Sequence, residues 1–329
     1  MKPFTFEKPK NLAQTQDLKI KTKSFLAGGT NLVDLQKKNI VNPDGLIDVS
    51  EALSNNIKTT KNRLVIGAMV KNTELTLNND LLKHSPLISK AVLAGASPQI
   101  RNMASTAGNL LQRTRCPYFY DTSAPCNKRN PNSGCSALKG DTHNMAVAGY
   151  SQQCVATHPS DLCVALATLD AEVTVADGKK ESIIAFKDFH RLPGETPWLD
   201  NNLPENAVIT QIEIPENGFN KNFAYLKIRE RSSYAFALIS VAAALQIENG
   251  KIKEARLASG GVAHKPWRWL EAEKFLQGKS ATPEVFAQAA TLATSGLKPL
   301  PDNAYKVPLL KGAIESALKQ ALQPESAII

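Results

Sequence analysis

The segment KSFLAGGTNLVDLQKK (Lys23–Lys38) joins a short apolar run to a helical pattern through two adjacent glycines. Its first residues have the composition of a strand, and Leu32 and Leu35 fall on one face of the helix that follows. The segment therefore predicts a strand, a tight turn and a helix start. Glycine lets backbone N–H groups approach a ligand, and a helix start adds partial positive charge, so this turn suits a phosphate or diphosphate. The motif is not GxGxxG, and a Gly-Gly turn alone is more often structural than functional.

Strands and helices are predicted on both sides of this segment. A helix over residues 81–96 carries Pro86 in the first turn of its main part, and a buried helix over residues 160–170 is capped by Ser160. The predicted strands are GLIDVS (45–50), RLVIGAMV (63–70), the hairpin AEVTVA, DGKK, ESIIAF (171–186) and NAVITQIEIP (206–215).

The pattern changes near Gly218 to long strands followed by helices. The strands are FAYLKIRERS (223–232), YAFALISVAAALQIENG (234–250) and KIKEARLASGGVA (251–263), with turns at Ser232/Ser233 and at residues 248–250. The helices are WRWLEAEKFLQ (267–277), PEVFAQAATLA (283–293) and AYKVPLLKGAIESALKQAL (304–322). Strands followed by helices predict an α+β fold, with one domain over residues 1–218 and a second over 219–329.

A second glycine turn is predicted in ASTAGNL (104–110). Thr106, Gly108 and Asn109 offer a hydroxyl, a bare backbone and an amide there, so two separate turns could hold the two ends of one diphosphate. Asp161, in THPSDL, supplies a carboxylate that could accept two hydrogen bonds from a ribose diol. The alternative for Asp161 is an acid that stabilises the first turn of the following helix.

The bulk composition is that of an ordinary globular chain. Its 329 residues are enough for two or three domains, and no apolar stretch reaches the roughly 18 residues of a membrane span. The net charge of +9 is spread over short lysine-rich patches such as Lys19–Lys23, without a nucleic-acid recognition motif. A docking surface for an acidic partner is the better prediction. The first residues lack an apolar signal region, so no secretion signal is predicted.

Four of the five cysteines lie in a loop without periodicity, over about residues 112–156. Cys116, Cys126, Cys135 and Cys154 follow the spacing C-x9-C-x8-C-x18-C, which matches no common zinc or ferredoxin pattern. An iron–sulfur cluster, a structural zinc ion and unrelated thiols all remain open from the spacing. The loop contains little apolar sequence and no run that predicts a helix, so a cross-linking centre would explain its folding. Cys163, among leucines and valines, is predicted to be a buried core thiol.

Several of these motifs together resemble one known family. FLAGGTNLVDL, QIRNMASTAGNLLQRTRCPYFYDT, PCNKR, SGCSAL, CVATHPSDL and SYAFALISVAAAL closely resemble the flavoprotein subunits of the xanthine dehydrogenase, or molybdenum hydroxylase, family. The resemblance is strongest to the FAD-binding middle subunits of bacterial periplasmic aldehyde oxidoreductases. It implies a two-part FAD-binding domain of the family's type, known as PCMH-like, with an iron–sulfur loop insertion. It also implies a C-terminal domain of the CO dehydrogenase flavoprotein type.

The resemblance also implies roles for individual residues. The FAD diphosphate would be held by the run Ser24, Phe25, Leu26, Ala27, Gly28, Gly29, Thr30, Asn31 and Leu32. Thr106, Gly108 and Asn109 would make the second phosphate contact, Asp161 would bind on the adenosine side, and Lys227 would contact the flavin. The alternative for Lys227 is a basic residue on an exposed strand, without a role in cofactor binding. The four loop cysteines, Cys116, Cys126, Cys135 and Cys154, would hold a [4Fe–4S] cluster. Many relatives carry glycine where this chain has Ala107, which restricts slightly how near the diphosphate lies.

The implied activity belongs to a heterotrimeric oxidoreductase. A large molybdenum cofactor subunit would oxidise aldehydes to carboxylic acids, and a small subunit would carry two [2Fe–2S] clusters. The present chain would pass electrons through FAD to an external acceptor, and none of its residues would act on the aldehyde. The resemblance implies a periplasmic location through co-export with a signal-bearing partner, with the cytoplasm as the alternative. Binding to nucleic acid and membrane insertion are not expected.

Two other classes of protein fit some of the same features. A zinc-stabilised nucleotide-binding or scaffold module would also use four cysteines and glycine turns, but it would have no redox activity. A self-contained flavin oxidase would need a substrate pocket with its own base, and the sequence identifies none. The sequence contains neither HExxH nor G-x-S-x-G, so hydrolysis is not predicted. Most of the five histidines are predicted to be surface or core residues.

Overall fold

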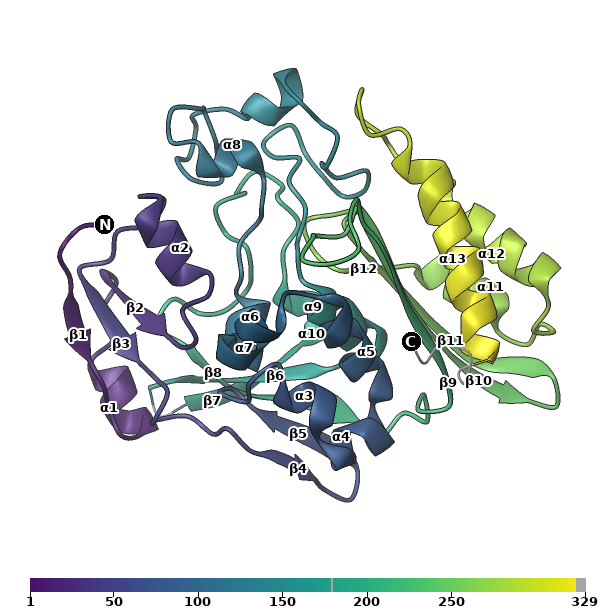
Figure 1. Ribbon diagram of the computed structural model, residues 1–329, viewed down its shortest axis with the longest axis horizontal. Helices are drawn as coiled ribbons and strands as arrows, with labels where there is room; N and C mark the ends of the chain where they lie inside the picture. Colours follow the sequence, from purple (N-terminus) through teal and green to yellow (C-terminus); the bar gives the residue numbers. More distant parts are fainter. Residues whose placement is uncertain (179, 324–329) are drawn as a thin grey trace.

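The computed structural model describes residues 1–178 and 180–323, and this part of the chain forms three β-sheets (Figure 1). The first sheet is small and parallel, in the order β1-β3-β2. Its strands are β1 (Thr5–Glu7), β2 (Lys23–Leu26) and β3 (Gly45–Asp48), and its helices are α1 (Leu12–Asp17) and α2 (Leu32–Lys37). The KSFL strand and the helix after the glycines are therefore confirmed.

The second sheet has five strands in the order β4-β5-β8-β6-β7, with every neighbouring pair antiparallel. The strands are β4 (Ile57–Thr59), β5 (Arg63–Gly67), β6 (Glu172–Asp177), β7 (Lys180–Ala185) and β8 (Val208–Pro215). The helices packed around it are α3 (Glu74–Leu77), α4 (Asn79–His84), α5 (Pro86–Ala94), α6 (Pro98–Met103), α7 (Thr106–Leu110), α9 (Asp161–Thr168) and α10 (Phe186–Phe189). The β6–β7 hairpin is confirmed, although Lys179 of its turn lies outside the described residues.

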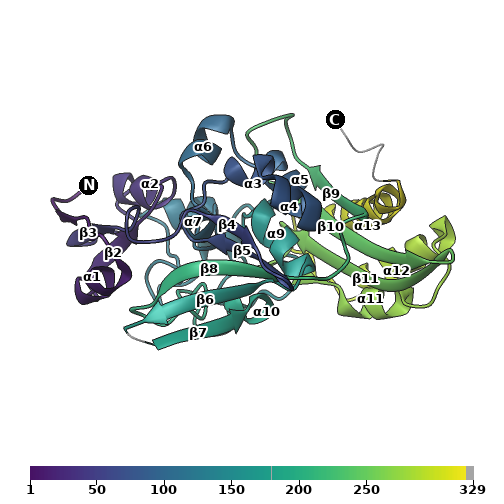
Figure 2. The ribbon, with the colours of Figure 1, turned by 90° about the horizontal axis from the view of Figure 1, so that it is seen from below.

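The third sheet runs β12-β11-β10-β9 and is antiparallel. Its strands are β9 (Asn222–Ile228), β10 (Ile239–Glu248), β11 (Lys251–Gly260) and β12 (Trp267–Arg268), followed by α11 (Leu270–Leu276), α12 (Pro283–Thr294) and α13 (Lys306–Leu322). Figure 2 shows the first and third sheets at opposite ends of the molecule, with the second sheet between them. The α+β prediction is confirmed. Residues 324–329, placed in the predicted second domain, lie outside the described part.

Strand β10 explains how the third sheet joins the rest of the molecule. Successive side chains of a strand point to opposite faces. Ala242 and Ala244 belong to the core shared with α5 and α9, whereas Val241, Ala243 and Leu245 belong to the core shared with α11–α13. Because both faces are covered, residues 241–245 of the strand are all apolar rather than alternating.

Local capping accounts for two helices predicted from sequence. Ser160 accepts a hydrogen bond from the backbone N–H of Cys163 at 3.0 Å and so caps α9. Pro86 occupies the first turn of α5, where its missing N–H costs nothing. Cys163 is completely buried in α9, which confirms its predicted core position.

Several predictions of local structure were wrong. The single helix predicted over residues 81–96 is divided at Ser85 into α4 and α5. Trp267 and Arg268 form β12 rather than the start of a helix, because they pair with Ser259 and Ala258 of β11. The second long strand begins at Ile239 instead of Tyr234, so residues 229–238 form a longer connection. ASTAGNL is no open turn, because its last five residues form α7 with Ser105 as the cap.

The cysteine-rich loop is largely irregular, as predicted, and lies between α2 and the C-terminal helices (Figure 1). It contains two short helical pieces, α8 (Pro117–Tyr120) and the 3₁₀ turn η1 (Ser136–Lys139), although no helix was expected there. Pro117 at the first helical position favours α8. Phe119 anchors it, being fully buried beside Leu35 of α2.

Candidate functional site

A large cavity lies where the parts of the molecule meet. Its volume is about 1270 Å³, which exceeds the roughly 300–1,000 Å³ of an ordinary small-molecule site. It is lined by the β2–α2 turn, by α7, by the start of α9, by β9 and by the first residues of the cysteine loop. Such a cavity has room for a ligand as large as a dinucleotide.

The β2–α2 turn supplies one wall of this cavity. Of the predicted run, Ser24, Phe25, Ala27, Gly28, Gly29, Thr30, Asn31 and Leu32 line it. Leu26, the last residue of β2, does not line it. Leu26 is therefore removed from the predicted set of lining residues.

The two glycines of this turn are required for different reasons. A Cβ on Gly28 would lie 2.0 Å from the backbone oxygen of Met103, so only glycine lets the turn approach that segment. Gly29 has a φ of +71°, a conformation that other residues rarely adopt.

The same turn presents a row of backbone donors. Within the described part of the chain, the N–H groups of residues 28–32 have no protein acceptor. Consecutive free N–H groups in a turn form an anion-binding concavity. Asn31 extends this row: its Oδ1 accepts from the backbone N–H of Arg113 at 2.9 Å, whereas its buried Nδ2 has no partner among the described residues. These donors fit the oxygens of a diphosphate.

Helix α7 contributes the second wall, with one correction. Gly108 and Asn109 line the cavity, as does Ala107. Thr106 does not: it is fully buried, and both its hydroxyl and its backbone N–H donate to the carbonyl of Val70, at 2.9 and 2.8 Å. Its polar groups are thus used inside the protein.

Asp161 and Lys227 come together on the cavity wall from α9 and β9. Lys227 Nζ donates to Asp161 Oδ2 at 2.7 Å and to the carbonyl of Ala94 at 3.1 Å, and its side chain is only 4% exposed. Tyr225 donates its hydroxyl to Asp161 Oδ1 at 2.6 Å. Burial, and then the charge of Asp161, raise the pKa of Tyr225 well above its usual value. Lys227 is therefore a buried ion-pair partner, not a free residue on an exposed strand. The ribose and flavin contacts themselves stay predictions.

Basic side chains outnumber acidic ones in the lining of the cavity. Lys19, Lys21 and Lys23 line it, although the Lys21 side chain is 86% exposed. Docking of an acidic partner on this patch stays a prediction. Burial lowers the pKa of Lys19, whose Nζ lies 5.7 Å from the centre of the Phe25 ring. A cavity lined by cations favours an anionic ligand.

The structure brings the four loop cysteines into one region. Cys126 and Cys135 face each other across an isolated antiparallel bridge. Cys154 donates its thiol hydrogen to Cys135, which lowers the pKa of Cys135 to about 6. Burial, and to a smaller extent the neighbouring Cys126 and Cys135, raise the pKa of Cys116 to about 11. All four are free thiols.

The spacing of these thiols bears on the kind of metal centre. Within residues 1–178 and 180–323, no three ligand atoms from these four cysteines lie within 4.8 Å of one another. A zinc ion with Zn–S bonds of about 2.3 Å in tetrahedral geometry requires sulfurs roughly 3.8 Å apart. The four thiols therefore do not form a preassembled tetrahedral zinc site within the described residues.

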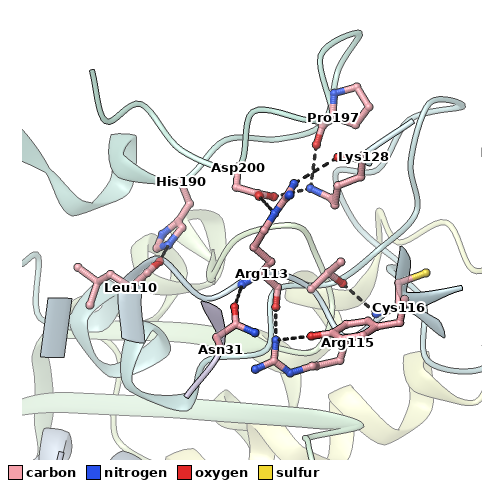
Figure 3. Close-up of polar contacts among 11 residues, drawn as sticks. Asn31, Leu110, Arg113, Arg115, Cys116, Lys128, His190, Pro197 and Asp200 are labelled. Carbon is pink, nitrogen blue, oxygen red and sulfur yellow. Dashed lines mark hydrogen bonds and ion pairs between the residues drawn. The ribbon is translucent and has the colours of Figure 1, made fainter. Parts of the chain in front are cut away.

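Sequence reasoning missed a partly buried ionic network next to this loop (Figure 3). Asp200 accepts from Arg113 Nε at 2.7 Å and from Lys128 Nζ at 2.5 Å. Burial alone would raise the pKa of Asp200, but the two cations hold it at about 2. No sequence signal marks this network, because its members lie far apart in polar segments that resemble solvated loops.

Histidines 158, 190 and 264 line a small neighbouring cavity with Lys128 and Asp200. Burial lowers the pKa of His190 to about 4 and that of His264 to about 3. His190 Nε2 donates to the carbonyl of Leu110 at 2.9 Å, which places its ring (Figure 3). His158, His190 and Cys163 also place one ligand atom each within 4.8 Å of one another. His190 and His264 are thus core histidines, which confirms the prediction for them.

These two histidines give an expected pH dependence of stability. The unfolded chain binds protons at these groups near pH 6.5, whereas the folded chain does so only near pH 4 and pH 3. Their contribution is therefore full above pH 6.5 and is lost as the pH falls towards 4, by on the order of 2 kcal/mol per histidine. Urea unfolding from pH 7.5 to 4.5 measures this slope. His264→Leu is expected to reduce it, and an unchanged slope would contradict the assignment.

The described part of the chain contains no helix that is both long and apolar enough to span a membrane.

Comparison with known proteins gives results consistent with this geometry. The family model described as the FAD binding domain in molybdopterin dehydrogenase matches residues 2–217. The CO dehydrogenase flavoprotein C-terminal domain matches residues 224–323.

Relatives and solved structures span nearly the whole chain. The aldehyde oxidoreductase FAD-binding subunit PaoB of Escherichia coli is 44% identical over 327 residues, covering 98% of this chain and 99% of that protein. The glyceraldehyde dehydrogenase medium chain of Sulfolobus acidocaldarius is 26% identical, covering 84% and 82% of the two chains. A carbon monoxide dehydrogenase structure from Hydrogenophaga pseudoflava matches with a TM-score of 0.77 at 21% identity, covering 98% of both chains.

Proposed function

Because the chain belongs to the flavoprotein subunits of the molybdenum hydroxylase family, we propose that it carries FAD and transfers electrons within a heterotrimeric aldehyde oxidoreductase. The family are oxidoreductases, and the FAD-binding subunit of the aldehyde oxidoreductase type is the match of highest identity given above. The observation that carries the proposal is the large cavity with a row of free backbone donors on one wall.

The residues of the cavity fit FAD in three respects. The N–H groups of residues 28–32 and the free Nδ2 of Asn31 would hold the diphosphate. Gly108 and Asn109 would complete that contact from α7. Asp161 keeps acceptor capacity for the ribose after its bonds to Tyr225 and Lys227, because each carboxylate oxygen has two lone pairs.

When bound, FAD supplies the redox chemistry, since it can take electrons singly or in pairs. The chain itself contributes binding, orientation and charge. Lys227, held by Asp161, fixes a cation on the wall of the cavity. No side chain of the described cavity is assigned to aldehyde chemistry, which we place in the large partner subunit.

The second cofactor of the proposal is a [4Fe–4S] cluster on Cys116, Cys126, Cys135 and Cys154. Its support is the convergence of four thiols in one largely irregular loop. Soft thiolates are the usual ligands of iron–sulfur clusters. The relatives' names mention FAD and no cluster, so this part rests on the cysteines alone.

Partners and location complete the proposal. Several relatives are named as medium chains or subunits of a complex. We therefore place this chain between a molybdenum cofactor subunit and a small subunit with two [2Fe–2S] clusters. Co-export with a signal-bearing partner would take it to the periplasm, with the cytoplasm as the alternative.

Anaerobic purification of the full chain tests the proposed function. The protein is expected to be yellow-brown, with about one FAD, four iron atoms and four acid-labile sulfides per chain. It should show no aldehyde oxidation alone, because its cavity holds no aldehyde chemistry. A colourless protein with stoichiometric zinc would favour the scaffold alternative instead. Aldehyde turnover by the isolated chain would contradict the proposal that aldehyde oxidation takes place in the large partner subunit.

A further inference from the structure

The Asp200 network (Arg113, Lys128 and Asp200) links the cysteine-rich loop to the rest of the molecule (Figure 3). Lys128 lies two residues after Cys126 and is 4% exposed. Its Nζ donates to Asp200 Oδ1 at 2.5 Å and to the carbonyl of Pro197 at 2.9 Å. The loop is therefore held to the segment that carries Asp200 by a buried charged contact.

Arg113 forms the other half of the connection. Its Nε donates to Asp200 Oδ2 at 2.7 Å, and its Nη2 donates to the backbone carbonyl of Lys128 at 3.2 Å. Its guanidinium also lies 4.7 Å from the centre of the Phe119 ring in α8. The Asp200 carboxylate thus binds both Lys128, which belongs to the loop, and Arg113, which contacts it.

The backbone of Arg113 carries this connection into the cofactor cavity. Its N–H donates to Asn31 Oδ1 at 2.9 Å, and this bond orients the Asn31 amide. The Nδ2 of that amide is buried and unpartnered among the described residues, at a position that lines the cavity. A displacement of Arg113 therefore moves a donor for the diphosphate.

Asp200 and Lys128 do not themselves line the large cavity within the described residues. Arg113 and Asn31 provide a path of direct contacts through which they can affect a ligand there. A buried lysine left without its carboxylate is strongly unfavourable, so loss of Asp200 would displace Lys128 and release Arg113.

We propose that Asp200 is a positioning residue that couples order in the cysteine-rich loop to FAD binding in the cavity. The coupling is reciprocal: FAD orders the loop, and the ordered loop tightens FAD binding by the same factor. This inference rests on the proposed function for FAD binding at the cavity, but it does not require that the loop carry iron.

The test uses the full chain, stripped of FAD and titrated back with FAD while flavin fluorescence is followed. Asp200→Asn is expected to weaken FAD binding by about tenfold, within the usual range of allosteric coupling. Hydrogen exchange across residues 116–154 should slow on FAD addition in the original chain and respond little in the variant. Glu248→Gln is the matched control, because it removes a carboxylate from an exposed ion pair with Lys253. It should change neither result.

A second variant separates coupling from general destabilisation. Lys128→Met should also weaken FAD binding, and the double variant with Asp200→Asn should bind no more weakly than Asp200→Asn alone, because both act through one connection. Asp200→Glu should restore much of the affinity. If Asp200→Asn fails to fold, Lys128→Met decides the question: unchanged FAD affinity would overturn the coupling.

The outcomes distinguish this inference from the proposed function. If Asp200→Asn and Lys128→Met bind FAD as tightly as the original chain, and FAD slows hydrogen exchange in the loop of both variants, the coupling is overturned. The proposed function then still stands. Additive losses in the double variant also overturn it, since they indicate two independent effects. Failure of the original chain to bind FAD overturns both the proposed function and the coupling.

Discussion

Alanine in place of Gly28 is expected to weaken FAD binding at least a hundredfold. The added Cβ would lie 2.0 Å from the backbone oxygen of Met103 and 2.7 Å from its carbonyl carbon. Backbone atoms cannot move aside as a flexible side-chain end can, so the β2–α2 turn must shift. This shift spreads the row of N–H donors that fits the diphosphate. The same strain should lower the free energy of unfolding by about 1–3 kcal/mol.

Gly296→Ala is the control for this prediction. Its Cβ meets no atom within 4 Å, and its backbone is outside the left-handed region. FAD titration and urea unfolding of both variants separate the two consequences. The control should match the original chain in both measurements. If Gly28→Ala binds FAD with unchanged affinity, the β2–α2 turn is not the diphosphate site.

Serine in place of Cys126 is expected to remove iron and acid-labile sulfide from the purified chain. A hydroxyl is a poor substitute for a soft thiolate ligand, and Cys126 contacts Cys135 across the bridge that closes the loop. Without the centre, the loop over residues 112–156 keeps only small apolar clusters, around Phe119 and around Met145 and Val155, so we expect it to become less ordered. It should then become the main site of proteolytic cleavage. Through the Asp200 network, FAD affinity should also fall by about tenfold.

The matched control is Cys163→Ala. Cys163 is completely buried in α9 and outside the loop, so this variant should retain iron and sulfide while losing some stability. Iron and sulfide assays, limited proteolysis and FAD titration of both variants check the prediction. Full retention of iron in Cys126→Ser would contradict the assigned ligand set. Loss of assembly with normal flavin reduction would indicate a structural role for the centre rather than an electron relay.

Several features of the cavity could be predicted from sequence because their causes lie within a few residues. The two glycines after KSFL require a tight turn, and the helix follows from the spacing of Leu32 and Leu35. Ser160 caps α9 through a bond to a residue three positions later. The β6–β7 hairpin likewise depends on a short turn between neighbouring strands.

Other features depended on segments that meet only in the folded chain. Thr106 looked like a phosphate contact beside Gly108, but Val70, 36 residues earlier, takes both of its donors. The Trp267–Arg268 pair looked helical, but the exposed edge of β11 takes it as a strand. In both cases, backbone groups from a distant segment form the hydrogen bonds, and the local sequence does not show where that segment lies.

The sequence by itself determined the family, the glycine turn with its helix, and the loop with four cysteines, because these depend on residue type and short spacing. Only the tertiary structure decided that Asp161 meets Lys227 across 66 residues and that Asp200 joins Lys128 to Arg113. The physical reason is that a buried charge needs a partner, yet nothing in the local sequence states which distant charge will supply it.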